Sequence, residues 1–312
     1  MDIAITGATG FLGSALAARL AGDLHNVFAF TRRASAPSQD NVQIINAGNL
    51  SLDADWREAV AGIEAVVHCA ARVHVMQDTA ADLLAAFREV NVNGTMNLAR
   101  QAATAGVKRF VFISSVKVNG EATQPGCPFT EADSPNPQDA YGQSKHEAEQ
   151  SLRKLSADSG MEVVIIRPPL VYGPGVKANF ASLMRAVKRG WPLPFGAVHN
   201  QRSFVAIDNL VDFIVTCISH PLAANQTFLV SDGHDLSTTD LVRRMALAAG
   251  VSLRLIPVPS WAVRAGGTLI GRRDAVQRLY GNLQIDISKS QTLLGWRPSV
   301  SIEEGMRRAM SA

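Results

Sequence analysis

Residues 5–17 read ITGATGFLGSALA. The stretch starts at the end of an apolar, strand-like segment, passes through glycines at 7, 10 and 13, and continues into an alanine- and leucine-rich helical pattern. Glycines at this spacing between a strand and a helix allow a tight turn, close approach of a pyrophosphate to the backbone, and close packing of helix on strand. The helix N-terminus favours the anion. We therefore predict a dinucleotide-binding turn, which decides the fold class.

Short β-branched runs alternate with helical patterns through the first part of the chain. We expect strands at 1–8, 25–30, 42–47, 65–71, 109–115 and 162–169, and helices at 10–22, 54–62, 83–106 and 140–160. This alternation is typical of a parallel sheet built from right-handed crossovers. The prediction is an α/β fold, with a Rossmann-type doubly wound parallel sheet forming a dinucleotide-binding domain over residues 1–172.

Proline and glycine interrupt the pattern more often after residue 172. Possible strands at 202–207 and 226–231 are separated and followed by helical segments. We predict that residues 173–312 form mainly a smaller C-terminal substrate-binding cap, with segments at about 200–232 returning to the main sheet.

The composition of the 312 residues is that of an ordinary globular protein, with 47% hydrophobic and 18% charged residues. A net charge of +3 gives no reason to expect nucleic acid. Cys69, Cys127 and Cys217 are an odd number without metal-site spacing, which favours a reducing compartment and argues against a metal site. We expect a cytoplasmic protein without a signal peptide or membrane insertion, because no apolar stretch is long enough to span a bilayer.

Tyr141 and Lys145 in YGQSK lie four residues apart, on one face of an expected helix. Upstream, Ser114 and Ser115 end an expected strand at the sheet edge where ligands bind in such folds. A phenol with a pKa of about 10 is a poor base near neutrality, and we expect the nearby ammonium to lower the Tyr141 pKa. A serine hydroxyl could orient the substrate oxygen. Together these residues predict a catalytic site.

At this point the chain resembles the extended short-chain dehydrogenase/reductase family of nucleotide-sugar epimerases, dehydratases and reductases. The resemblance covers nearly the whole length. The motifs that carry it are, in order, TGATGFLG (6–13), VVHCAA (66–71), NVNGT (91–95), ISS (113–115), YGQSK (141–145), RPPLVYGPG (167–175), RSFVAIDNL (202–210) and LLGWRP (293–298).

The resemblance implies a role for each matching position. The catalytic residues would be Ser115, Tyr141 and Lys145. The cofactor-binding residues would be Gly7, Thr9, Gly10, Phe11, Leu12, Gly13, Thr31, Arg32, Arg33, Asn49, Leu50, Cys69, Ala70, Ala71, Asn91, Tyr141, Lys145 and Pro168. The substrate-binding residues would be Ser115, Lys117, Asn179 and Arg202. Asn179 could instead cap the helix that follows it, and Arg202 could be a surface charge.

Two positions depart from the family pattern. The family's dehydratases carry an Asp-Glu pair directly after the catalytic hydroxyl residue, whereas this chain has Val116 and Lys117. Dehydration is therefore not expected. Leu170 stands where many members have an asparagine that touches the substrate, so substrate contacts do not transfer directly from the standard 4-epimerases.

The end of the second expected strand bears on the cofactor. An acidic residue there would accept hydrogen bonds from the adenosine ribose and repel a 2′-phosphate. This chain has Thr31, Arg32 and Arg33 instead, which suit the additional phosphate of NADP(H). NAD remains the alternative, because both arginines could simply be solvated.

Three functions follow from these observations. HCAARVHVM (68–76), KVNGE (117–121) and RPPLVYGPGVKANF (167–180) are most similar to bacterial reductases that convert UDP-4-keto-6-deoxy-N-acetylglucosamine to UDP-N-acetylquinovosamine for surface polysaccharides. We therefore expect an NADP(H)-dependent 4-ketoreductase of a UDP-sugar, acting as a homodimer. The alternative is a UDP-hexose 4-epimerase, acting on UDP-glucose or UDP-N-acetylglucosamine with tightly bound NAD. A non-catalytic dinucleotide-sensing regulator is a remote alternative, since it would not need Ser115, Tyr141 and Lys145 together.

Overall fold

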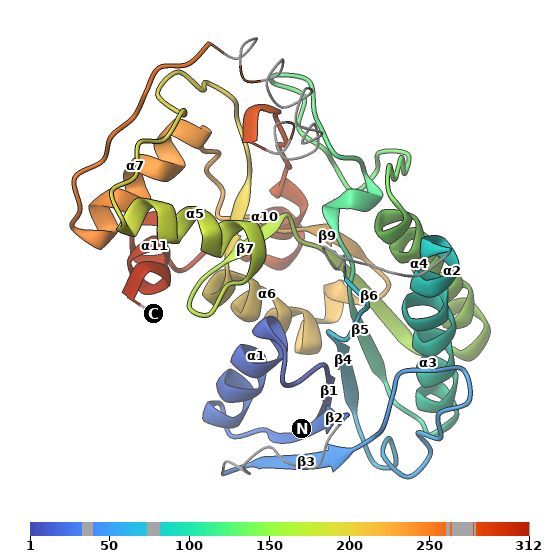
Figure 1. Cartoon of the computed structure of the whole chain (residues 1–312). Helices are drawn as coiled ribbons and strands as arrows, with labels where there is room; N and C mark the ends of the chain where they lie inside the picture. The colour runs from blue at the N-terminus through green and yellow to red at the C-terminus, as the bar shows by residue number, and fades with distance from the viewer. Residues whose placement is uncertain (33–39, 74–81, 260–262, 264–276, 278, 312) are drawn as a thin grey trace.

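A parallel sheet of seven strands forms the centre of the computed structural model, in the order β3-β2-β1-β4-β5-β6-β9 (Figure 1). The structure describes residues 1–32, 40–73, 82–259, 263, 277 and 279–311. The strands are β1 (Asp2–Thr6), β2 (Asn26–Thr31), β3 (Val42–Asn46), β4 (Ala65–His68), β5 (Arg109–Ile113), β6 (Glu162–Arg167) and β9 (Thr227–Leu229). The order reverses between β1 and β4, which is the switch point of a doubly wound sheet. This confirms the predicted Rossmann-type α/β fold.

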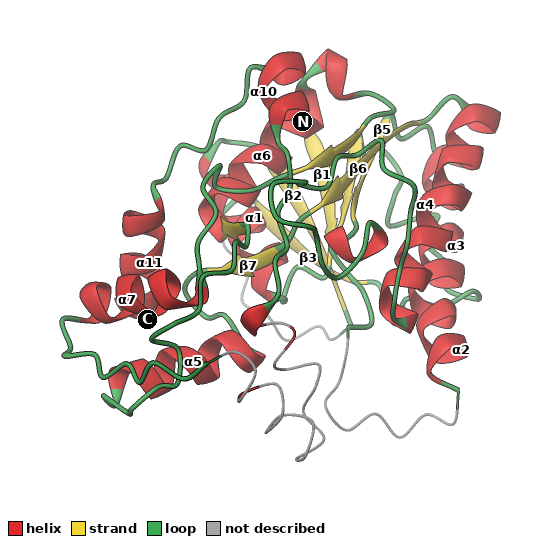
Figure 2. Ribbon diagram, turned by 90° about the horizontal axis from the view of Figure 1, so that it is seen from above, coloured by secondary structure: helices red, strands yellow, loops and turns green. Residues whose placement is uncertain are grey.

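Helices cover both faces of the sheet, which Figure 2 shows from above. α1 (Phe11–Gly22) and α6 (Ile207–Ser219) pack on one face, and α3 (Thr95–Thr104) and α4 (Ala140–Ser159) pack on the other. Side chains alternate between the two layers along a strand, so that Val67 contacts the α1 side and Val66 the α3 side. Burial on both faces explains why these strands read as continuous apolar runs.

A second core lies in the C-terminal part of the chain. It is enclosed by α5 (Ala178–Lys188), α7 (Thr238–Ala249) and α11 (Ile302–Ser311) beside a two-stranded parallel sheet of β7 (Leu170–Tyr172) and β8 (Phe204–Ala206). Figure 1 shows these helices together at one end of the molecule, opposite α3 and α4. We call this part the cap. A short helix, α10 (Ser288–Leu294), packs near β9.

The residues between 200 and 232 contribute to both parts. β9 pairs with β6 in the main sheet, and α6 packs against α1, whereas β8 pairs with β7. A buried carboxylate joins these pieces, since Asp232 accepts hydrogen bonds from Tyr172 Oη (2.8 Å), the Ala206 N–H (2.9 Å) and Asn209 Nδ2 (2.7 Å). The division into two domains at residue 172 stays a prediction.

The helix expected at 54–62 does not form, and this segment consists of turns. The Trp56 N–H donates to Gln101 Oε1 (2.7 Å), and the indole stacks on Phe30 at 5.7 Å between ring centres. Burial of Trp56 and Val60 against the sheet supplied the apolar spacing that resembled a helix. The expected helix at 83–106 forms in three pieces: α2 (Leu83–Arg88), a π-helical turn (Glu89–Gly94) and α3.

A buried ion pair joins α4 to the centre of the sheet. Glu149 on α4 is fully buried and accepts from Arg167 Nε (2.9 Å) and Nη2 (2.5 Å) at the end of β6. The same carboxylate accepts from Ser114 Oγ (2.6 Å), and Arg167 Nη1 donates to Asn119 Oδ1 (3.0 Å). Glu149 therefore holds α4 against the ends of β5 and β6. Its partner Arg167 extends the contact to Asn119, in the segment after β5.

Removal of the Glu149 charge should destabilise the fold strongly. Glu149→Gln leaves the buried Arg167 guanidinium without a counter-charge, and we expect the free energy of unfolding to fall by about 3 kcal/mol. Arg153→Met is the matched control, because Arg153 contacts the same carboxylate at 3.3 Å but its side chain is 46% exposed. In this control, the free energy of unfolding should fall by less than about 1 kcal/mol. Equal losses for the two variants in urea unfolding would contradict a special role for the buried pair.

Candidate active site

The glycine turn between β1 and α1 is packed too tightly for any side chain at two of its three glycines. A Cβ atom on Gly7 would lie 2.9 Å from the Ala70 backbone nitrogen, and Gly7 has a φ of +68°. A Cβ on Gly13 would lie 2.2 Å from the Gly7 carbonyl oxygen. Gly13 therefore lets α1 lie directly on the turn, while Gly7 lets the turn lie against the segment after β4.

The N-terminus of α1 is suited to an anion. The helix starts at Phe11, has no acidic residue in its first turn and receives no side-chain cap from Gly10. Its first backbone N–H groups, which include those of Phe11 and Leu12, have no carbonyl within the helix to accept them. Thr9 and Gly10 are exposed beside them. This cradle fits the pyrophosphate of a dinucleotide.

The segment after β4 lies along the glycine turn and is held by buried polar groups. The Ala70 N–H donates to Thr6 Oγ1 (3.2 Å), which also contacts His68 Nδ1 (2.8 Å), and His68 Nε2 contacts Thr95 Oγ1 (3.0 Å). Burial and, to a lesser extent, the Lys145 charge lower the His68 pKa to about 3. His68 is therefore neutral at physiological pH and links three elements. Sequence analysis missed this link, although the polar residues at the ends of two neighbouring strands were a signal.

Cys69 and Ala71 flank Ala70 and are, like it, half-buried. Burial raises the Cys69 pKa to about 12, so this thiol is not a nucleophile at neutral pH. Asn91 lies in the π-helical turn and is almost fully buried. Its Oδ1 accepts from the Arg72 N–H (2.8 Å), and its Nδ2 donates to the Arg72 carbonyl (3.0 Å) and to Ser144 Oγ (3.0 Å). Asn91 thus ties the segment after β4 to α4.

The predicted adenosine end of the site is only partly described. Thr31 is buried at the end of β2, and Arg32 is exposed directly after it. Arg33 lies outside the described residues. Asn49 is exposed, and Leu50 packs so closely on the π-helical turn that a Cβ on Gly94 would lie 2.8 Å from its carbonyl oxygen.

The two serines after β5 have different surroundings. Ser114 is buried, and its hydroxyl donates to Glu149. Ser115 is half-buried, and its Oγ accepts from the Lys117 N–H at 3.2 Å. The Val116 N–H donates to the Pro168 carbonyl (3.0 Å), which fixes this segment against the end of β6. The alternation of a strand therefore presents Ser115, and not Ser114, as the available hydroxyl.

Tyr141 and Lys145 lie on the first turns of α4. The Lys145 ammonium is almost fully buried over the Phe112 ring, 4.2 Å from its centre, and burial lowers its pKa to about 7. Tyr141 packs edge-on against Phe87, at 6.0 Å between ring centres. Burial and, to a lesser extent, the Asp139 carboxylate raise the Tyr141 pKa to about 12. The Tyr141 pKa is thus raised, and not lowered as expected, with desolvation of the phenol as the larger cause.

Lys117, expected to contact substrate, is bound by two carboxylates. Its Nζ donates to Glu121 Oε1 at 2.8 Å and to Asp139 Oδ2. A role of this residue at the substrate stays a prediction.

The other expected substrate residues belong to the cap. Asn179 is exposed in the first turn of α5, whose N-cap is Lys177, so the alternative that Asn179 caps this helix is wrong. Arg202 precedes β8 and donates from Nη1 to the Gly281 carbonyl (3.0 Å). Leu170 begins β7 and is 42% exposed. Contact of these residues with a substrate stays a prediction.

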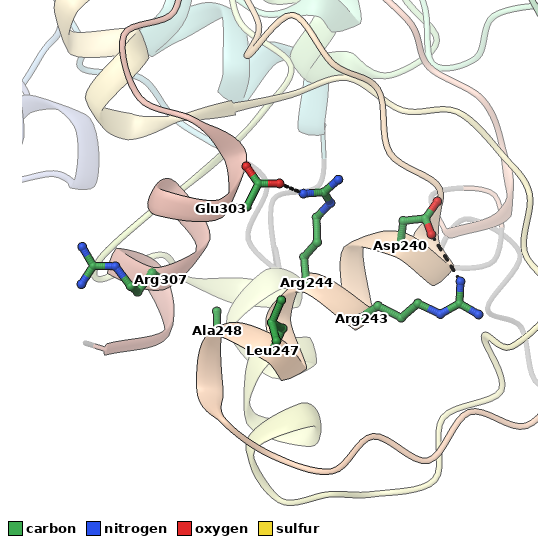
Figure 3. Close-up of a pocket in the computed structure, with 7 residues that line it drawn as sticks. All are labelled: Asp240, Arg243, Arg244, Leu247, Ala248, Glu303 and Arg307. Carbon is green, nitrogen blue, oxygen red and sulfur yellow. Dashed lines mark hydrogen bonds and ion pairs between the residues drawn. The ribbon is translucent and has the colours of Figure 1, made fainter.

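A surface pocket lies elsewhere, between α7 and α11 (Figure 3). Its three arginines are ion-paired: Arg243 with Asp240, Arg244 with Glu303, and Arg307 with Glu304. Within the described residues, no three His, Cys, Asp or Glu side chains are grouped so as to hold a metal ion. No helix in those same parts of the chain is long and apolar enough to cross a membrane.

The model of the NAD dependent epimerase/dehydratase family matches residues 3–231, which include the glycine turn, Ser115, Tyr141 and Lys145. The chain belongs to this family. A UDP-glucose 4-epimerase of Vibrio cholerae is 51% identical over 312 residues, covering 100% of this chain and 95% of that protein.

Two further proteins are similar to this chain over nearly its whole length. A GDP-6-deoxy-D-mannose reductase of Pseudomonas aeruginosa is 27% identical, over 98% of this chain and 95% of its own. The crystal structure of a UDP-glucuronic acid 4-epimerase from Bacillus cereus, in complex with NAD, superposes with a TM-score of 0.81 at 22% identity, covering 100% of this chain and 96% of that one. The last comparison shows the shared fold.

The contact at Gly13 gives a direct test of the glycine turn. Gly13→Ala forces α1 away from Gly7, and we expect a loss of at least about 1 kcal/mol of stability and about tenfold weaker NADH binding. Gly22→Ala is the control, because Gly22 ends the same helix and its Cβ would meet no atom within 4 Å. Thermal unfolding and NADH fluorescence titration measure both effects. A folded Gly13→Ala protein with unchanged NADH affinity would contradict the assignment.

Proposed function

We propose that this protein is a UDP-sugar 4-epimerase that keeps its nicotinamide dinucleotide through the catalytic cycle, with UDP-glucose as the first substrate to test. The observation that carries the proposal is the 51% identity, over the entire chain, to the Vibrio cholerae protein named UDP-glucose 4-epimerase. This favours the epimerase over the reductase that the sequence motifs suggested. The cytoplasmic location and the homodimer stay predictions.

The side chains at the carboxyl edge of the sheet suit reversible oxidation at C4. Tyr141 would take the proton of the C4 hydroxyl during oxidation and return it during reduction, and Ser115 would hold the same oxygen. With a pKa of about 12, the Tyr141 phenol is protonated at neutral pH when no ligand is bound, and it can then only donate a proton. Binding of the cofactor and the substrate must therefore favour the phenolate before Tyr141 can accept a proton.

Lys145 has a different part in this proposal. Its ammonium is buried over the Phe112 ring of β5. We assign it to the ribose of the cofactor and to the electrostatics of the phenol. When bound, a nicotinamide dinucleotide supplies reversible hydride exchange at the sugar C4. The cradle formed by Gly7, Gly10 and Gly13 would hold its pyrophosphate.

A second function is favoured by one observation. No acidic residue lies in β2, and Arg32 is exposed directly after this strand. A guanidinium at this place suits the 2′-phosphate of NADP(H). An NADP(H)-dependent 4-ketoreductase acting on UDP-4-keto-6-deoxy-N-acetylglucosamine is therefore the second candidate.

The two candidates differ in what they consume. The epimerase should convert UDP-glucose, or UDP-N-acetylglucosamine, to the galacto epimer without added nucleotide, because the hydride that leaves C4 returns to it. Chromatography of the UDP-sugars measures this conversion. Tyr141→Phe should reduce turnover by about 10²–10⁴-fold with little change in dinucleotide affinity. Turnover near that of the unchanged protein would exclude Tyr141 as the proton-transfer residue.

The reductase is tested in parallel with UDP-4-keto-6-deoxy-N-acetylglucosamine and NADPH. Stoichiometric loss of NADPH absorbance, with no epimer formed from either UDP-hexose, would overturn the epimerase proposal. Replacement of Arg32 and Arg33 by alanine separates the cofactors. An epimerase that uses NAD should keep its activity in this variant, whereas a reductase that uses NADPH should lose affinity for NADPH far more than for NADH.

A further inference from the structure

Lys117 contacts both Ser115 and Asp139, the residue that caps the helix carrying Tyr141. Its backbone N–H donates to Ser115 Oγ at 3.2 Å. Its Nζ donates to Asp139 Oδ2, and Asp139 precedes α4 by one residue. The other oxygen of Asp139, Oδ1, accepts from the Gly142 N–H at 2.7 Å and so caps the helix that carries Tyr141.

The backbones in this region are equally close. A Cβ on Gly142 would lie 2.8 Å from the Lys117 carbonyl oxygen, so the first turn of α4 lies directly on the turn that follows Ser115. The side chains of Lys117 and Asp139 are 27% and 34% exposed, which leaves their pairing only partly screened by water. Glu121, the second partner of Lys117, is 32% exposed.

We propose that Lys117 is a positioning residue, whose ion pair with Asp139 holds the first turn of α4 against the segment that carries Ser115 and offsets the carboxylate charge beside Tyr141. The proposal deepens the function proposed above and rests on it for the catalytic role of Tyr141. The electrostatic part follows from charge alone: an unpaired carboxylate disfavours the phenolate, whereas a paired one disfavours it less.

Several charged groups lie on α4 and on the segments that contact it. Those on the neighbouring elements are Arg72 and Arg88 near Phe87, Glu147 paired with Arg88, Lys145 on α4, and the group of Lys117, Glu121 and Asp139. Among these described charges, Asp139 is the one that raises the Tyr141 pKa. Its compensation by Lys117 is therefore the contact to change.

Two substitutions should move the Tyr141 pKa in opposite directions. Lys117→Met keeps most of the side-chain stem but leaves Asp139 uncompensated, so the pKa should rise. Asp139→Asn keeps a good helix cap and removes the negative charge, so the pKa should fall. We expect each shift to be about half a pH unit to one unit, because the pair is partly exposed. Lys117→Arg should restore the original value, and Glu121→Gln, which does not change Asp139, should shift it less than either.

The measurement that does not depend on turnover is NMR of protein labelled with ¹³C at the tyrosine Cζ. The chain has three tyrosines, and Tyr141→Phe identifies the resonance of Tyr141. At the highest pH at which circular dichroism shows all variants folded, the phenolate fraction should decrease in the order Asp139→Asn, unchanged protein, Lys117→Met. If Lys117→Met does not fold, Lys117→Gln takes its place in this series.

The pH profile of kcat/KM for epimerisation provides the second readout. Its acid limb should move to higher pH in Lys117→Met and to lower pH in Asp139→Asn. A purely structural contact would lower kcat in both variants without opposite shifts, and that result, or any other order of phenolate fractions, would overturn the proposal. Absence of epimerase activity in the unchanged protein would contradict the proposed function instead, while the NMR series would still test the ion pair.

Discussion

The contact between Glu149 and Arg167 determines where the candidate catalytic groups stand. Both side chains are buried, and a buried pair is tolerated only when good geometry and additional hydrogen bonds compensate for desolvation. Here Ser114 and Asn119 supply those additional bonds. Because Glu149 lies one helical turn beyond Lys145, the pair sets the position of Lys145 and Tyr141 relative to Ser115. This pair thus holds α4, which carries the candidate catalytic residues, against the sheet.

A second constraint acts at the other side of the site. Gly7, Gly13 and Ala70 bring the glycine turn, α1 and the segment after β4 into backbone contact. Two sets of buried hydrogen bonds hold the same segment. One runs from Thr6 through His68 to Thr95, and the other is made by Asn91. The proposed dinucleotide cradle on the turn and the proposed proton-transfer residue on α4 are therefore positioned by contacts that are independent of the cap. The cap carries the residues expected to select the sugar.

The sequence predicted the sheet and most of its helices because glycine spacing and apolar periodicity report local backbone geometry and burial. The helix predicted at 54–62 is wrong. Trp56 and Val60 lie in a segment of turns, and their burial gives the apolar spacing of a helix. The sequence could not show that Lys117 is paired with Asp139, twenty-two residues away, or that desolvation dominates the Tyr141 pKa. Both depend on packing between elements. The cofactor could not be chosen from this strand end either, because the exposed Arg32 fits a solvated position as well as a phosphate site.

The central claim is that the glycine turn holds a nicotinamide dinucleotide that stays bound while the sugar is oxidised and reduced. The most direct measurement is to purify the protein without added nucleotide, denature it, and quantify the released nucleotide by chromatography and mass spectrometry. The account predicts NAD in an amount close to that of the protein. Protein that releases no dinucleotide, and that binds and consumes NADPH when it is supplied with a 4-keto sugar nucleotide, would contradict it.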